Sequence, residues 1–252
     1  MRQALKNQEI GLDPNFTYRG KNQTRVEAFS DAAFALAITL LVLSSTVPTS
    51  FTELVSSTKQ IIPFGACVTL IMVIWYQHYL FFLQYGLQDI KTVSINTILI
   101  FLILVYVYPL KFLSRFLFES VYALLTGNIN HFQSIYPDIS NDHIGFLMVF
   151  YGLGASCIFL VLAWMYHYAY QKRQALQLTD YEQFSTIVSR RTNLLMASLP
   201  LLSGLIAWIL PFGIGLSYAI SGFIYFLYTP LMFAHASYVK KQMKKKFPDL
   251  ID

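Results

Sequence analysis

The sequence predicts an all-α integral membrane protein with six transmembrane helices per chain, on two observations. The 252 residues are 56% hydrophobic and only 12% charged, whereas about a quarter of the residues of a soluble domain are charged. Six apolar runs are close to the length of ~20 residues that a helix needs to cross a bilayer. None of them alternates between apolar and polar residues, as a strand of a membrane barrel does. The runs extend roughly over Glu27–Val47, Ile62–Gln84, Val93–Phe112, Ile144–Tyr170, Asn193–Leu210 and Gly213–Val239.

The distribution of basic residues predicts the orientation of these helices. Of the 18 Lys and Arg residues, all but Lys59, Lys111 and Arg115 fall on one side of the six runs. Because cytoplasmic segments are enriched in Lys and Arg, both termini are expected in the cytoplasm of a multi-pass cell-membrane protein. The same topology accounts for the net charge of +5 without nucleic-acid binding.

The chain then divides into three parts. Residues 1–24 form a cytoplasmic N-terminal segment, residues 25–239 the six-helix transmembrane domain, and residues 240–252 a basic cytoplasmic tail that could contact anionic membrane lipid. One connection is long: residues 113–143 are rich in Gly, Asn, Pro and Ser and are expected to be an external loop, with room for a short amphipathic segment.

The first helix has two distinct sides. At about 100° per residue, Leu36, Thr39, Leu40 and Leu43 fall on one stripe, and Asp31 lies roughly 120° from it. Small alanines between the two sides allow other helices to approach closely. The spacing alone does not say whether the stripe faces a pore, another helix or lipid, and it favours helix packing.

Asp31 is expected to have polar partners, because a charge facing lipid is costly. The second helix returns to the depth of Asp31 near Trp75 and His78, and the third begins there with Asn96. We therefore expect a network across three helices. Its members would be Arg25, Ser30, Asp31, Trp75, His78 and Asn96. The alternative is that His78 only meets water at the membrane interface.

Enzymatic chemistry is not expected. The sequence contains no Gly-rich phosphate loop, no Cys-x-x-Cys and no His-Glu-x-x-His, so no cofactor and no bound metal are predicted. A triad of Ser30, His78 and Asp31 is disfavoured because adjacent helical residues diverge by about 100°.

The motif Arg25-x-x-x-Phe29-Ser30-Asp31 at the start of the first membrane helix resembles the transmembrane protein 175 family of potassium channels. A single six-helix unit is similar to the bacterial members. The resemblance implies a homotetramer whose first helices surround a central pore, with potassium as the permeant ion and leak-type conduction. It also implies that no carbonyl-lined filter is present, and the string Thr-Val-Gly-Tyr-Gly is absent.

Carried over by position, the resemblance assigns roles to particular residues. The pore constriction falls on Leu36, Leu40 and Leu43, with Thr39 as a hydroxyl layer that contributes to selectivity. The structural polar network falls on Arg25, Phe29, Ser30 and Asp31, with Trp75, His78 and Asn96 as partners.

The sequence is also compatible with one other class of function. An ion- or proton-coupled secondary transporter would also hold titratable groups such as Asp31 and His78 inside the membrane boundary. Against it, the sequence has no internal half repeat, and it predicts few broken helices apart from those at Pro109, Pro200 and Pro230.

Overall fold

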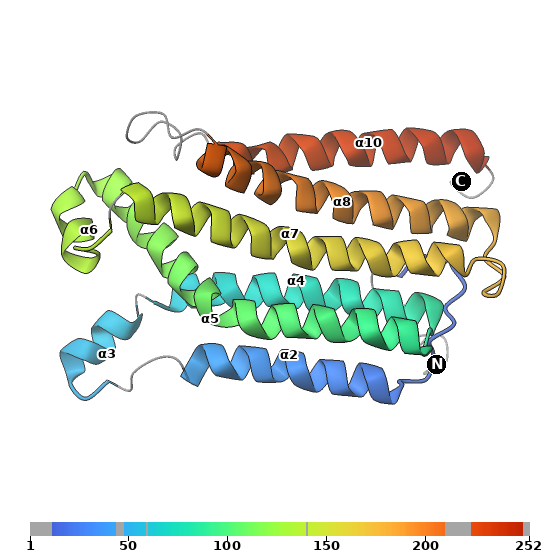
Figure 1. The fold of residues 1–252 in the computed structure, drawn as a ribbon, viewed down its shortest axis with the longest axis horizontal. Coiled ribbons are helices and arrows are strands. Elements are labelled where there is room, and N and C mark those ends of the chain that lie inside the picture. Colours follow the sequence, from blue (N-terminus) through green and yellow to red (C-terminus); the bar gives the residue numbers. More distant parts are fainter. Residues whose placement is uncertain (1–11, 44–47, 59, 140, 210–222, 249–252) are drawn as a thin grey trace, which may run out of the picture.

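The computed structural model describes residues 12–43, 48–58, 60–139, 141–209 and 223–248, and all regular elements in these ranges are helical. The prediction of an all-α fold is therefore confirmed for the described part of the chain. The long helices lie side by side along one axis, and the first residues of α2 lie at the same end as the last residues of α10 (Figure 1). The short helices α3 and α6 lie at the other end.

Within the described residues, five helices are long and apolar enough to cross a membrane. These spans are α2 (Arg25–Leu43), α4 (Ile61–Tyr85), the first half of α5 (Ile90–Thr126), α7 (Asn141–Gln171) and α8 (Asp180–Ile209). The expected sixth run, 213–239, lies partly outside the described residues. Its later part forms the 3-10 turn η1 (Ile224–Leu227) and α10 (Tyr228–Lys246), which packs beside α8 (Figure 1). A sixth crossing therefore stays a prediction.

The expectation that residues 113–143 form a long loop is wrong up to Thr126, while their external location stays a prediction. Helix α5 continues to Thr126, Gly127 ends it with a positive φ of 68°, and α6 (Ile129–Ile135) follows. The short helix α3 (Phe51–Thr58) was not expected either. Residues 113–126 contain neither Gly nor Pro, so nothing in the local sequence stops the helix after it leaves the apolar run.

Helix α5 bends near Pro109, as Figure 1 shows. Proline removes one backbone hydrogen bond and clashes with the preceding turn. The Tyr151 hydroxyl of α7 donates a hydrogen bond of 2.6 Å to the Pro109 carbonyl. Beyond the bend, Lys111 reaches α2, where its Nζ donates to the Leu41 carbonyl at 3.2 Å. A lysine at this position satisfies a backbone group and complements the negative end of the helix dipole.

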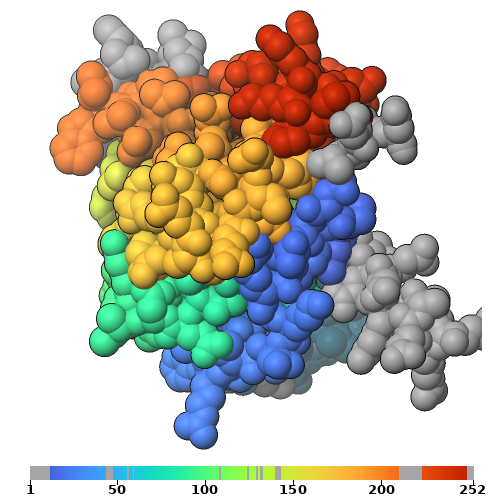
Figure 2. Space-filling view, turned by 90° about the vertical axis from the view of Figure 1, so that its right-hand side faces the viewer, coloured from blue at the N-terminus to red at the C-terminus, as the bar shows by residue number. Residues whose placement is uncertain are grey.

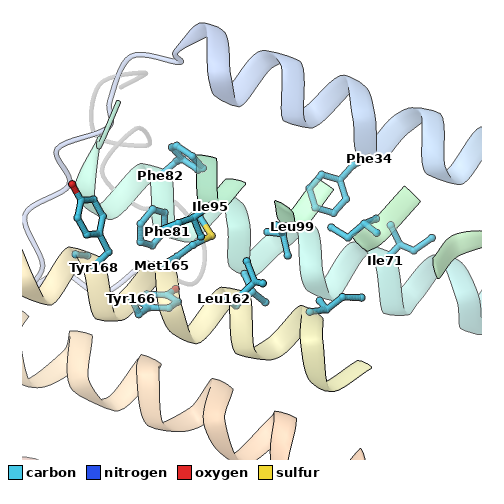
Figure 3. Packing of buried hydrophobic residues seen from close by; sticks show 14 of the residues in the cluster. Phe34, Ile71, Phe81, Phe82, Ile95, Leu99, Leu162, Met165, Tyr166 and Tyr168 are labelled. Atoms are coloured by element: carbon cyan, nitrogen blue, oxygen red, sulfur yellow. The ribbon is translucent and has the colours of Figure 1, made fainter. Parts of the chain in front are cut away.

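The apolar core lies between α2, α4, α5 and α7. Phe34 of α2 packs near Ile71 of α4 and Leu99 of α5, and Phe81 meets Tyr166 of α7 edge to face at 5.4 Å between ring centres (Figure 3). Helix α8 lies on the outer side of α7. The two approach so closely that a Cβ on Gly152 would come within 2.4 Å of the Pro200 carbonyl oxygen. Only glycine allows this approach.

The N-terminal segment crosses the end of the bundle before α2 begins. Gly20 donates a backbone hydrogen bond of 2.9 Å to the Leu83 carbonyl, and a Cβ there would lie 2.1 Å from the Phe82 oxygen. Phe16 is buried against Tyr85. Figure 2 shows this end of the molecule, with the blue segment beside the yellow part of the chain and reaching toward the red helix α10. The segment therefore ties the start of α2 to α4.

Candidate functional site

Helix α2 begins with a capping box. Thr24 Oγ1 accepts a hydrogen bond from the Glu27 backbone N–H at 3.2 Å and donates to Glu27 Oε1 at 2.8 Å, and the Thr24 N–H donates to the same oxygen. The pattern Thr-x-x-Glu satisfies backbone donors that would otherwise be unpaired at a helix start. It explains why polar residues precede the apolar run.

One face of α2 packs against the rest of the chain. The buried residues Ser30, Phe34, Ala37 and Leu41 recur every three or four positions and face α4 and α5. Small Ala37 has no exposed surface, so the neighbouring helices approach α2 closely at its midpoint.

The opposite face of α2 is uncovered by the chain itself. On this face Leu36 is 49% exposed, Leu40 42% and Leu43 72%, and Thr39 is exposed between them. Helix α2 lies at one side of the bundle, which leaves this stripe free for contact with another molecule or with solvent (Figure 1). The three leucines predicted as a constriction and the neighbouring Thr39 thus share one exposed face.

Thr39 keeps acceptor capacity on that face. Its hydroxyl donates to the Ala35 carbonyl at 2.9 Å, within the same helix. A hydroxyl that donates in this way retains oxygen lone pairs directed outward. The side chain can therefore offer an oxygen to a cation or to water beside the leucines.

Ser30, Asn96 and His78 form a continuous chain of hydrogen bonds across three helices. The Ser30 hydroxyl donates to the Val26 carbonyl at 2.8 Å, Asn96 Nδ2 donates to Ser30 Oγ at 2.8 Å, and His78 Nε2 lies 2.8 Å from Asn96 Oδ1. Because the Asn96 oxygen can only accept, His78 Nε2 carries the proton. All three side chains are at most 2% exposed. This chain joins α2, α4 and α5 through polar contacts in an otherwise apolar core.

Asp31 belongs to a separate group. Its Oδ1 accepts from the Trp75 indole at 2.8 Å, and its Oδ2 accepts from the Gln23 amide at 2.9 Å. The Trp75 ring stacks on Tyr79 with 5.7 Å between centres. Both carboxylate oxygens thus have a donor, one from α4 and one from the segment before α2.

The sequence predicted a single polar network, but the structure has two separate groups of hydrogen-bonded side chains. Two of the expected members belong to neither group. Ser30 and Asp31 are adjacent but diverge by about 100° around the helix, so they meet different partners. Arg25 and Phe29 are exposed, and Arg25 forms no hydrogen bond or ion pair with any residue in the described ranges. Gln23 was missed by sequence reasoning, because it precedes the helix and has no periodic relation to Asp31.

A second set of polar contacts that the sequence did not indicate lies on the N-terminal segment. Arg19 pairs with the fully buried Glu182 of α8, with 2.8 Å between Nη2 and Oε2. Glu182 Oε1 also accepts from the Thr17 backbone at 2.7 Å, and Oε2 from the Thr179 backbone at 2.9 Å. The spacing Thr179-x-x-Glu182 repeats the capping pattern of α2. This pattern in the sequence could have predicted where α8 begins.

Helices of this length and hydropathy define a multi-pass membrane protein. The sequence model of the family described as "Endosomal/lysosomal potassium channel TMEM175" matches residues 25–109, which include all the residues predicted to form the constriction and the network. A potassium channel of Marivirga tractuosa is 53% identical over 240 residues, which cover 95% of this chain and 97% of the relative.

A solved structure gives the same result. The crystal structure of the potassium channel MtTMEM175, as a threonine-to-alanine variant in complex with a nanobody–MBP fusion protein, superimposes with a TM-score of 0.83. It is 53% identical, and the match covers 92% of this chain and 100% of that one. The chain belongs to the TMEM175 family of potassium channels, among its bacterial members.

Proposed function

We propose that this chain forms a homotetrameric, potassium-selective, leak-type cation channel in the cell membrane, with both termini in the cytoplasm. The observation that supports it best is the free face of α2, where Leu36, Leu40 and Leu43 are 49%, 42% and 72% exposed in the single chain. One such helix cannot enclose a pore. Copies of α2 around an axis would cover these faces and make a pore of them.

The constriction would be hydrophobic. Leucine side chains from several copies would meet on the axis and form a narrow apolar neck, and such a neck stops ions by excluding water. No charged barrier and no carbonyl-lined filter is needed. Opening would then require only that the helices move apart at Leu36, Leu40 and Leu43.

Selectivity would arise at the same level. An ion that enters an apolar neck loses part of its hydration shell, and potassium holds that shell less tightly than sodium. The outward lone pairs of Thr39 would replace some of the lost ligands, which favours the ion that is cheaper to dehydrate. The 2.9 Å bond to Ala35 fixes the direction of that hydroxyl.

The two polar groups would hold the pore helix at a defined angle. Ser30 is bound to Asn96 of α5, and Asp31 to Trp75 of α4, both within the first two turns of α2. These bonds fix the start of α2, while its other end is contacted by Lys111 of α5 at the Leu41 carbonyl. A small tilt about the fixed start would change the width of the neck.

The test combines a mass measurement of the detergent-purified protein with potassium efflux from liposomes. We expect the mass of four chains, a several-fold larger flux for Leu36→Ala because the neck widens, and a several-fold lower preference for potassium over sodium for Thr39→Ala. Leu202→Ala on α8 is the matched control, since that leucine is 48% exposed but lies far from α2, and it should behave as wild type. A mass of one chain, or unchanged flux and selectivity in both pore variants, would refute the proposal.

The same liposomes separate a channel from a carrier. A channel passes flux that rises in proportion to the driving force and ignores an imposed proton gradient. A proton-coupled carrier saturates and responds to that gradient. The relatives are described as channels, which supports the first outcome.

A further inference from the structure

A groove lies between α8 and α10 near the last turns of α10, and its volume is about 190 Å³. Its walls are mostly apolar. Phe184, Ile187 and Val188 contribute from α8, and Tyr238 and Val239 from α10. A groove of this size and character fits a stretch of hydrocarbon chain, but not a whole lipid.

Basic side chains line the same groove. Arg191 of α8 and Lys246 of α10 both contribute to it, and the Lys246 ammonium lies 5.4 Å from the centre of the Phe184 ring. Helix α10 carries five lysines and no acidic residue over Tyr228–Lys246. The groove therefore combines an apolar floor with positive charge, the two features that an anionic amphiphile needs.

The position of the groove suits a membrane ligand. Helix α10 lies on the opposite side of the bundle from α2 (Figure 1). If α2 faces the axis, as in the proposed function, α10 faces the surrounding lipid. Its lysines lie in the last turns, at the end of the bundle predicted to be cytoplasmic, where the leaflet surface is negatively charged.

We propose that this groove binds one anionic phospholipid of the cytoplasmic leaflet. An acyl chain packs along Val188, Ile187 and Val239, and the phosphodiester lies beside Arg191 and Lys246. Diffuse attraction between the basic tail and the membrane surface would use every exposed lysine of α10 about equally. A groove site instead depends on the two cations that line it and on the space between the helices.

Native mass spectrometry of the detergent-purified protein tests the proposal, with dioleoyl phosphatidylglycerol and dioleoyl phosphatidylcholine as probes. We expect preferential retention of the phosphatidylglycerol. Arg191→Gln with Lys246→Gln should weaken that retention by about tenfold. Lys244→Gln with Lys245→Gln removes the same charge from residues that do not line the groove, and it should leave the retained lipid nearly unchanged.

A second variant keeps the charges and fills the space. Val188→Phe should displace the lipid as strongly as the loss of both cations, and the single Arg191→Gln serves if the double variant does not fold. Glycerol phosphate, the headgroup without acyl chains, should not compete. The proposal would be overturned if the control with Lys244→Gln and Lys245→Gln lost as much phosphatidylglycerol as the groove variant. It would also be overturned if Val188→Phe retained the lipid fully, or if glycerol phosphate competed with it. None of these results bears on potassium flux, so the proposed function stands or falls separately.

Discussion

At the scale of single residues, neighbouring side chains on α2 are bound by different helices. Ser30 points into the bundle and meets Asn96, whereas Asp31 points about 100° away and meets Trp75. The depth of these residues could be predicted from the sequence by counting turns along each apolar run. Their pairing could not, because it depends on the rotation of each helix about its own axis. The direction of the Arg25 side chain could not be predicted either. It was expected at the level of Asp31, but its side chain is exposed.

Asn96 is expected to be the most sensitive member of its group, because its amide bonds both His78 and Ser30. Asn96→Leu removes two buried hydrogen bonds. Bonds between membrane helices contribute about 0.6 kcal/mol on average and up to ~1.7 kcal/mol, so the free energy of unfolding should fall by about 1–3 kcal/mol. The measurement is unfolding in detergent micelles by titration with sodium dodecyl sulfate.

Thr97→Val is the control for that prediction. The Thr97 hydroxyl is exposed and donates only to the Val93 carbonyl of its own helix. Its loss should change the unfolding free energy by less than about 0.5 kcal/mol. If the two variants were equally stable, the buried chain of hydrogen bonds would contribute nothing to the fold.

At the scale of elements, hydropathy predicted which segments are helices but not where the helices end. Membrane length limits only the apolar part of a helix, so α5 and α8 extend past their apolar runs into polar sequence. The ends are instead marked by local signals, such as Gly127 after α5 and the Thr179-x-x-Glu182 box at α8. The sixth run lies partly outside the described residues, and its crossing stays a prediction.

The start of α5 gives an element-scale prediction about pH. Burial acts to raise the pKa of Asp89, but hydrogen bonds from Thr92 and Tyr168 outweigh it and hold the pKa below its ordinary value of 3.8. The folded state therefore binds this proton less tightly than the unfolded state does. The stabilisation is present above the ordinary pKa and is lost as the pH falls through the lowered value.

Asp89→Asn tests that assignment through the apparent melting temperature in detergent. At neutral pH the variant should melt below wild type, and the difference should shrink as the pH falls below about 4. Tyr168→Phe, which removes one donor and keeps the ring, should show a smaller effect of the same sign. A difference that stays constant across the acid range would mean that Asp89 acts through packing and not through its charge.

At the scale of the whole molecule, the N-terminal segment connects α2 to the far side of the bundle. Arg19 donates to Glu182 of α8 and to the carbonyls of Leu176 and Gln177, and the next residue, Gly20, is held by α4. Three residues later Gln23 donates to Asp31. A short chain of contacts therefore joins α8 to the start of α2, and it bypasses the apolar core.

The ion pair between Arg19 and Glu182 is expected to be the strongest point of this connection. Glu182 has no exposed surface, and Arg19 is 20% exposed at the side chain. Arg19→Met leaves a buried carboxylate without its cation, which typically costs about 3–5 kcal/mol. The double variant with Glu182→Met should be less destabilised than the sum of the two single variants by at least about 1 kcal/mol, because it removes both charges. Lys21→Met, an exposed cation on the same segment, should have little effect on stability.

Unfolding and limited trypsin digestion of these variants together test the connection. If the pair anchors the segment, Arg19→Met should be cleaved at Lys21 or Arg25 faster than wild type under conditions where the helices remain folded, because the segment opens before the bundle does. Additive destabilisation in the double variant, or cleavage no faster than in wild type, would show that the segment is held by Phe16 and its backbone bonds instead. In that case the start of α2 would be positioned by its contacts with α4 and α5, and substitutions on α8 should leave potassium flux unchanged.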